Sequence, residues 1–310
     1  MPLPDLRVHD NQTAAVVTAD GLSIRSDVLF TNDKGEEKES VQKRTKKILQ
    51  KLRPALQRIV QPGESVLYAM RARSPLSPLE QLTAAWWTSL LAACAIVVTN
   101  KRILFFPVKR DGSWRESVQA VYWGDVNEIK QTGLLVHNVY FKFKNGTKAT
   151  YANVLRGSAK KLSSIASVMI PNASGEQTAA SGLVHLCPAC CGPLTEGRYF
   201  CPSCGLIFKN EKTMILRSIL LPGGGYFYTG HPLVAIMPAA VEALLVVDIV
   251  SILFSGLRSP KAGQDLFARL LVLVIFWGLE TAVTILHSRR YVREFIPEKR
   301  EAARSPHIAR

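Results

Sequence analysis

Five of the six cysteines lie within eighteen residues, in the stretch CPACCGPLTEGRYFCPSC that runs from Cys187 to Cys204. Two residues separate Cys187 from Cys190 and Cys201 from Cys204, and ten residues separate the two pairs. Each C-x-x-C turn aims two sulfur atoms at one point. Two such turns on facing hairpins supply four thiolates in a tetrahedral arrangement, which is what a structural zinc site requires. We therefore predict a four-cysteine Zn²⁺ site with no open position and no catalytic role.

The two turns differ in the residue that follows each pair. Gly205 follows the second pair, where the turn needs a positive φ, whereas Cys191 takes that place in the first pair. Either Cys190 or Cys191 is therefore the second ligand, and we favour Cys190. Residues 185–210 resemble the zinc-ribbon family, whose CPxCG turns flank a short hairpin. Iron, a redox dithiol or disulfides are the alternatives to zinc. Thiolates that hold a metal must stay reduced, which indicates the cytosolic side of a membrane.

Positive charge dominates the chain. The 39 Lys and Arg exceed the 24 Asp and Glu, and the net charge of +15 favours anionic partners such as nucleic acid or a bilayer surface. The first thirty residues lack an apolar core of signal-peptide length, so we expect the N-terminus to start in the cytosol. Residues 1–38 are expected to form a weakly ordered arm. Residues 39–61 predict a basic amphipathic helix, kinked or divided at Pro54, that lies on anionic lipid or packs on its own domain.

Residues 62–171 predict a series of strands closed by one helix. CAIVVTNKRILFFPV is typical of a hairpin broken at Thr99-Asn100, and NVYFKFKNGTKATYANV contains the hairpin signal Asn145-Gly146. This order of elements, with VVTNKRILFFP in a central hairpin and VYWGDVNEIK after it, resembles the bacterial pleckstrin-homology-like and GRAM-like domains. The resemblance implies a partly open β-barrel capped by a C-terminal helix, in a family whose members bind lipid headgroups or protein partners. Residues 172–184 are small and polar and predict a linker.

Two groups of residues in this domain are candidate contacts. An anion needs several donors that converge on one point, and the alternative for the basic group is a solvated face. Trp86 and Trp87 lie in a long loop, where they predict either a wedge in a membrane interface or a small helix over the barrel mouth. The candidate anion contacts are Lys101, Arg102, Lys109 and Arg110.

Residues 231–256 and 264–288 are each long enough to cross about 30 Å of hydrocarbon as a helix. The connector LRSPKAG has two basic residues, whereas the tail 289–310 has seven, so we expect both flanks on the cytosolic side of the cytoplasmic membrane. The segment 211–230 breaks a helix at PGGG and supplies the interfacial aromatics Tyr226, Phe227 and Tyr228. Residues 214–288 resemble the small bacterial two-helix membrane domains marked by LLPGxGxFYxG.

Four charged residues interrupt the two apolar segments. Each lone charge in lipid costs about 3 kcal/mol, so partners or protonation are expected. Glu242 and Glu280 lie slightly cytosolic of the helix midpoints, and Asp248 and Arg269 lie toward the opposite side, where Arg269 can reach across to pair. The carboxylates form either a proton or cation site or polar contacts between helices or within a homo-oligomer; we favour polar contacts.

No nucleophile–base pair, phosphate loop or open metal site is evident, so we predict that the chain is not an enzyme. The predicted fold class is multidomain, with a β-barrel, a zinc ribbon and a transmembrane helical hairpin. The sequence favours a membrane-anchored adaptor or sensor that binds lipid headgroups or a protein partner. A membrane-tethered nucleic-acid-binding regulator and an oligomeric transporter or channel subunit are the alternatives.

Overall fold

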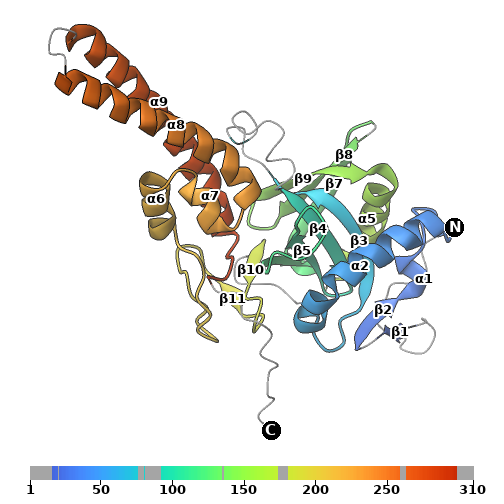
Figure 1. The fold of residues 1–310 in the computed structure, drawn as a ribbon. Helices are drawn as coiled ribbons and strands as arrows, with labels where there is room; N and C mark the ends of the chain where they lie inside the picture. The colour runs from blue at the N-terminus through green and yellow to red at the C-terminus, as the bar shows by residue number, and fades with distance from the viewer. Residues whose placement is uncertain are drawn as a thin grey trace. The chain divides into compact units, whose positions relative to one another are not determined.

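The computed structural model describes residues 16–19, 21–75, 80, 92–134, 136–173, 181–258 and 263–298. The chain divides into two compact units, which we call the sheet unit (Met1–Leu206) and the helical unit (Ile207–Arg310). The sheet unit holds the strands and the cysteine cluster, and the helical unit holds the apolar helices (Figure 1).

The sheet unit is built on a curled antiparallel sheet that forms half of a barrel. Strand β3 joins the two parts of the sheet, because it pairs with β4 on one side and, through Arg73 and Ala152, with β9 on the other. Both predicted hairpins are confirmed, since β4 pairs with β5 and β8 pairs with β9. A short 3-10 helix, η1 (Trp123–Asp125), joins β6 to β7. The elements are β3 (Val66–Arg73), β4 (Ala93–Thr99), β5 (Arg102–Pro107), β6 (Val118–Tyr122), β7 (Val126–Thr132), β8 (Val136–Phe143), β9 (Lys148–Leu155) and helix α5 (Arg156–Met169).

The sheet has an apolar cluster on each of its faces, which explains why β4 and β5 are apolar at nearly every position. Alternate residues of a strand point to opposite faces. Accordingly Ile103 and Phe105 join the inner cluster with α5, whereas Leu104 and Phe106 join the outer cluster. Phe105 of β5 stacks on Tyr151 of β9 with ring centroids 4.6 Å apart, so the inner cluster joins strands that are not neighbours in the sheet.

Helix α2 (Glu39–Ile59) covers the outer face of the sheet (Figure 1). Leu52, Leu56 and Ile59 are fully buried there, and truncating any one of them to Ala would cost about 2–5 kcal/mol. The helix therefore packs on its own unit, as the second of the two sequence interpretations stated, and its basic residues remain on the solvent side. Pro54 lies inside one continuous helix and does not divide it.

The described part of residues 1–38 is more ordered than the weakly ordered arm that the sequence predicts. Strand β2 pairs with β3 in parallel at Ile24 and Val66. Val28 is fully buried, and the ammonium of Lys161, on α5, donates hydrogen bonds to the carbonyl groups of Val28 and Thr31. These contacts are tertiary, and elements of four residues carry too little local signal to be read alone. The elements are β1 (Val16–Ala19), β2 (Leu22–Arg25) and α1 (Ser26–Leu29).

The cysteine-rich segment continues the same sheet. Strand β10 (Val184–Leu186) pairs antiparallel with β6, and β11 (Pro193–Leu194) pairs with β10. Leu186 joins the outer apolar cluster. Sequence reasoning placed this segment beyond a linker as a small knob of its own, whereas backbone pairing makes it an edge of the sheet.

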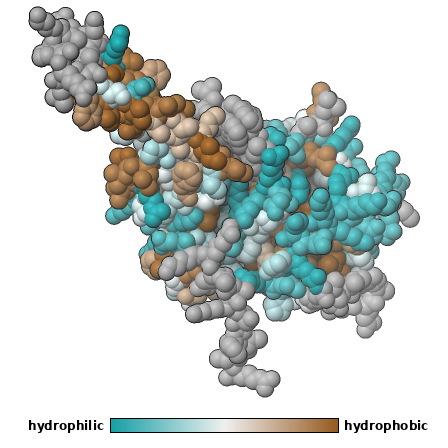
Figure 2. Space-filling model, in the orientation of Figure 1, coloured by the Kyte–Doolittle hydropathy of each residue, from teal (hydrophilic) through white to brown (hydrophobic). Residues whose placement is uncertain are grey.

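The helical unit contains a long apolar hairpin and two shorter helices. Helices α8 and α9 are long and apolar enough to cross a membrane over Pro232–Phe254 and Phe267–Arg293. Only 11% of the apolar stretch of α8 and 17% of that of α9 is buried within the protein. The core helices of a water-soluble domain, by contrast, are mostly buried. Figure 2 shows the apolar surface along this hairpin. The helices are α6 (Glu211–Leu220), α7 (Gly224–Thr229), α8 (Pro232–Arg258) and α9 (Gly263–Arg293).

Candidate metal centre and ligand pocket

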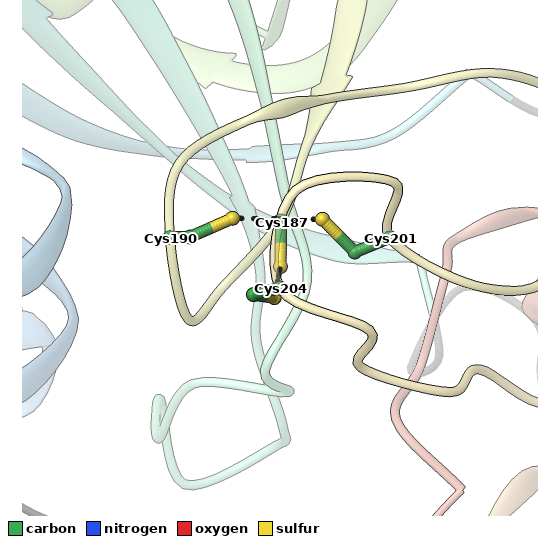
Figure 3. A group of neighbouring side chains, drawn as sticks. All are labelled: Cys187, Cys190, Cys201 and Cys204. Carbon is green, nitrogen blue, oxygen red and sulfur yellow. Dashed lines mark hydrogen bonds between the residues drawn. The ribbon is translucent and has the colours of Figure 1, made fainter.

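The four predicted cysteine ligands lie together, with their sulfur atoms directed at a common centre (Figure 3). The sulfurs of Cys187 and Cys204 are 3.6 Å apart, those of Cys190 and Cys201 are 3.5 Å apart, and all four lie within 4.8 Å of one another. A disulfide needs about 2.05 Å. Tetrahedral zinc with Zn–S bonds of about 2.3 Å needs sulfurs roughly 3.8 Å apart. The spacing therefore suits a metal ion held by four thiolates.

Two similar turns hold the cysteine pairs. In the first, the N–H of Cys191 donates to the carbonyl of Cys187 at 2.9 Å, and Gly205 makes the equivalent 2.9 Å bond to Cys201 in the second. The residue that closes each turn is left-handed, with φ of +60° at Cys191 and +74° at Gly205. Glycine adopts this conformation without cost, whereas a cysteine is strained there. The missing glycine in the CPACC sequence is thus accommodated by strain, and the two turns keep the same shape.

Cys191 lies outside the cluster, which answers the question of the second ligand in favour of Cys190. The Cys191 thiol donates to the carbonyl of Arg58, near the end of α2, at a sulfur–oxygen distance of 3.3 Å. The last carbonyl groups of a helix have no partner within the helix, so this contact satisfies one of them. Cys191 also packs against the outer apolar cluster. Cys191 therefore helps to attach the segment that carries the cysteines to α2 and the outer face of the sheet.

Burial and backbone hydrogen bonds act in opposite directions on the cysteine thiols. Burial raises the pKa of Cys187, and it raises the pKa of Cys190 to about 11. Burial also opposes ionisation of Cys201, but the backbone N–H groups of Cys204 and Ser203 donate to its sulfur and hold its pKa at about 7. Such donors stabilise a thiolate. The turns thus direct N–H groups at the atoms that would carry negative charge toward a metal.

The candidate anion contacts do not form one site. Lys101 lies in the turn between β4 and β5, whereas Lys109 and Arg110 lie in the loop after β5. Successive turns lie at opposite ends of the strand they share, and a strand of six residues spans about 20 Å. The three exposed or half-exposed basic side chains therefore cannot converge on one phosphate.

The prediction for Arg102 is corrected, because its side chain is 1% exposed. Its Nε and Nη2 atoms each lie 3.0 Å from a carboxylate oxygen of Glu64, and Nη2 also donates to the carbonyl of Ile59 at 2.7 Å. Burial by itself lowers the pKa of Arg102, but the hydrogen bond and the charge of Glu64 outweigh burial and raise it. Arg102 thus joins the end of α2 to the β4–β5 hairpin and faces no external ligand.

A pocket of about 370 Å³ lies between α2, β3 and the start of α5. Three basic residues of its lining, Arg44, Lys47 and Arg71, outnumber its single acid, Asp33. Tyr68 lines it too and donates a hydrogen bond from its hydroxyl to Ser158 at 3.0 Å. No side chain caps the N-terminus of α5, whose second and third residues border the pocket. Sequence reasoning recognised the basic helix but missed this site, because the lining comes from four segments that are far apart in the chain.

The aromatic residues predicted at the membrane interface divide into two groups. Tyr226 and Tyr228 are buried in the helical unit, which corrects that prediction for both, and Phe227 is exposed. The hydroxyl of Tyr226 lies 2.6 Å from Nδ1 of His287 on α9. The Tyr228 hydroxyl accepts a hydrogen bond from the backbone of Asn210 at 3.1 Å. Both tyrosines therefore hold helices together. The other interface candidates, Trp86 and Trp87, lie outside the described residues.

The four charged residues predicted to lie within the membrane have different surroundings. Glu242 is 1% exposed and accepts hydrogen bonds from the backbone N–H of Gly223 at 2.7 Å and from the hydroxyl of Thr284 at 3.4 Å. Glu280 is half-buried. Asp248 and Arg269 line one shallow depression between α8 and α9. Asp248 and Arg269 therefore line the same depression, whereas Glu242 has hydrogen-bond partners inside the helical unit.

The helical unit buries polar residues that the sequence did not single out. Thr281, Thr284 and Ser288 of α9 are buried, as are His231 and His287. The spacing of Thr281, Thr284 and Ser288, three and four residues apart on one face of α9, is the signal that could have found these three. The rings of His231 and Tyr291 lie 3.9 Å apart between centroids. The base of the helical unit is therefore polar inside, whereas its outer surface is apolar.

No protein-family model matches the chain, and no curated protein matches it. Among solved structures, the crystal structure of the C-terminal domain of an unknown protein from Leishmania infantum matches with a TM-score of 0.28 and 12% identity. The match covers 38% of this chain and 94% of that one.

Proposed function

We propose that this chain is a non-catalytic, membrane-anchored adaptor or sensor. In this proposal the helical unit is the anchor, and the sheet unit is a pleckstrin-homology-like binding domain that carries a structural zinc ion. The single observation that carries the proposal is the exposed apolar surface of α8 and α9 in a chain that also contains a closed four-cysteine cluster. Exposing that apolar surface to water costs free energy, whereas contact with the lipid acyl chains does not.

The order of elements supports the domain assignment. Seven antiparallel strands, β3 to β9, curl into half of a barrel and are followed directly by α5, which covers the inner apolar cluster. A partly open β-barrel capped by a C-terminal helix is the arrangement that the resemblance to pleckstrin-homology-like domains implies.

The sulfur geometry and the charge pattern support zinc and a cytosolic sheet unit. Four thiolates without an oxygen or nitrogen ligand suit zinc, and four protein ligands leave no position for a substrate. Reduced thiols persist in the cytosol. The basic residues after α9 favour the same side of the membrane for the end of the chain.

The pocket between α2, β3 and α5 is the site that we propose for the ligand. Its lining is largely apolar and includes Arg44, Lys47 and Arg71, so an anionic headgroup with a short apolar portion fits its chemistry. A volume of about 370 Å³ lies within the range of small-molecule sites. An anionic lipid of the same membrane is a ligand of this class.

Alkaline extraction of membranes from cells that express the full chain tests the anchor. We expect the protein to stay in the membrane pellet after carbonate washing and to need detergent for release. Recovery of the full-length protein in the supernatant after high-speed centrifugation without detergent would disprove the anchor.

Titration with short-chain lipids tests the ligand pocket in the purified, detergent-solubilised chain. Dioctanoyl phosphatidylglycerol should raise the free energy of unfolding of the sheet unit, by about 2.7 kcal/mol at one hundred times its Kd, and dioctanoyl phosphatidylcholine should not. Lys47→Glu should abolish the effect. Lys43→Glu is the matched control, because Lys43 is an exposed residue of the same helix outside the pocket. Equal responses of both variants would remove the pocket from the proposal, and binding of nucleic acid instead of lipid would favour the tethered regulator.

A further inference from the structure

We propose that α6 and α7 form a re-entrant hairpin, which enters the lipid beside α8 and α9 and returns to the same side. This inference rests on the proposed membrane anchor and goes beyond it, because it assigns a third membrane contact surface to the chain. The partner of that surface is the acyl region of the bilayer.

The outer face of α6 is apolar and uncovered within the helical unit. Its large apolar side chains, together with Leu221 of the following turn, are between 47% and 66% exposed. Figure 2 shows this apolar surface on α6 as well as along α8 and α9. Exposed apolar side chains on three helices of one unit favour the same solvent for all of them. The exposed side chains are Leu216, Ile219, Leu220 and Leu221.

The depth of the hairpin follows from its contacts with the spanning helices. Glu211, at the start of α6, is 3.1 Å from Arg289 and 3.4 Å from Arg293, at the end of α9. At the other end of α6, a Cβ on Gly223 would lie 2.8 Å from Ala235 and 2.9 Å from Ala239, which follow Pro232 on α8 by three and seven residues (235 − 232 and 239 − 232). Three to seven helical residues span about 5–10 Å, whereas the hydrocarbon layer is about 30 Å thick. The turn therefore lies inside the hydrocarbon layer, short of its middle.

Backbone groups at that depth need partners within the protein, because lipid offers none. Pro222 has no N–H to satisfy. The N–H of Leu221 donates to Arg217 at 3.0 Å, that of Gly224 donates to Leu221 at 2.8 Å, and that of Gly223 donates to the Glu242 carboxylate at 2.7 Å. The three N–H groups of the turn are therefore all bonded inside the unit. On this view Glu242 is the acceptor that allows a non-helical turn to exist in lipid.

Because glycine has no Cβ atom, Gly223 and Gly225 allow the turn to pack closely against α8 and α9. A Cβ on Gly223 would lie 2.8 Å from the carbonyl oxygen of Ala235 and 2.9 Å from Cβ of Ala239, both on α8. A Cβ on Gly225 would lie 2.6 Å from the Ser288 hydroxyl on α9. Real Cβ atoms essentially never come this close, so PGGG is needed for the turn to pack directly on both spans.

The charged groups of the hairpin are held at its base. The guanidinium of Arg217 lies 4.8 Å from the ring centre of Tyr228, and the ammonium of Lys209 lies 5.7 Å from the same ring. Long basic side chains in lipid extend toward the headgroups in this way. The base of the hairpin is thus charged and its tip is apolar, as a re-entrant element requires.

Labelling of introduced cysteines with a charged, membrane-impermeant maleimide tests the proposal in the full chain. The background is the metal-loaded protein with Cys94→Ser and Cys191→Ser, in membranes opened by freeze–thaw so that the reagent reaches both faces. Leu220→Cys places the probe near the tip of the hairpin, Lys212→Cys places it at the base, and Leu244→Cys places it on the lipid face of α8. We expect Leu220→Cys to label as slowly as Leu244→Cys, and at least tenfold more slowly than Lys212→Cys.

The outcomes separate this inference from the proposed function. Fast labelling of Leu220→Cys with slow labelling of Leu244→Cys would overturn the re-entrant hairpin and leave the anchor in place, with a protein partner as the occupant of the α6 face. Fast labelling of both would overturn the anchor itself. In the Leu220→Cys background, Glu242→Ala should raise the labelling rate at least tenfold, whereas Glu242→Gln, which keeps an acceptor oxygen, should not. Equal rates in these two variants would refute the role assigned to Glu242.

Discussion

Replacing Glu64 by alanine would leave the guanidinium of Arg102 buried without a counter-charge. Both side chains are at most 1% exposed, and two hydrogen bonds of 3.0 Å join them. Removing one partner of a buried ion pair costs about 3–5 kcal/mol, because the remaining charge stays in a medium of low dielectric. The bond from Arg102 to the carbonyl of Ile59 persists, but a carbonyl dipole does not neutralise a charge. We therefore expect Glu64→Ala to lower the free energy of unfolding of the sheet unit by about 3–5 kcal/mol.

Urea unfolding of the detergent-solubilised chain, followed by pulse proteolysis of the sheet unit, measures this cost. With a slope of about 2–3 kcal/mol per molar urea, the midpoint should fall by roughly 1–2.5 M. Glu39→Ala is the control, because Glu39 pairs with Lys43 at 2.7 Å on the surface, where the side chains are 77% and 75% exposed. Loss of such a pair should cost less than about 1 kcal/mol.

A double-mutant cycle decides whether the explanation is right. Arg102→Met combined with Glu64→Ala removes the stranded charge, so the double variant should be more stable than Glu64→Ala alone. If the two substitutions destabilise additively, the pair is not coupled. A midpoint for Glu64→Ala equal to that of Glu39→Ala would likewise refute the reasoning.

Three further predictions concern the cysteines, the PGGG turn and the buried lysine. Cys190→Ser should lose most of its bound metal and Cys191→Ser should retain one ion per chain, because only the first thiol lies in the cluster; metal analysis of the purified variants checks this. Gly224→Ala should destabilise the helical unit by about 1–3 kcal/mol or more, since its Cβ would overlap the Arg217 carbonyl, whereas Gly278→Ala, with nothing within 4 Å, should be neutral in thermal unfolding. Burial lowers the pKa of Lys161 from 10.5 to about 8, so the unfolded chain binds more protons between these values and the free energy of unfolding should rise with pH across that window. Urea midpoints at pH 8 and 10 should show a smaller rise in Lys161→Met than in the unaltered chain.

The sequence by itself predicted the features that depend on residues close together in the chain. The C-x-x-C spacing placed four sulfurs within reach of one ion, and Cys187, Cys190, Cys201 and Cys204 do cluster. Apolar runs of sufficient length predicted α8 and α9, and the signals at Thr99-Asn100 and Asn145-Gly146 predicted the two hairpins. Spacing, length and turn chemistry are local properties, and tertiary packing did not override them here.

Tertiary structure decided the roles of residues whose partners are remote. From the sequence, Arg102 is expected to be an exposed charge like its neighbour Lys101. In the structure its side chain is buried and bonded to Glu64 and Ile59, which lie about forty positions earlier in the chain. The cysteine segment reads as separate, yet β10 pairs with β6. The PGGG turn reads as a helix break, yet its glycines fit against α8 and α9. Burial and packing depend on which segments the fold brings together, and a side chain's charge or size does not specify its distant neighbours.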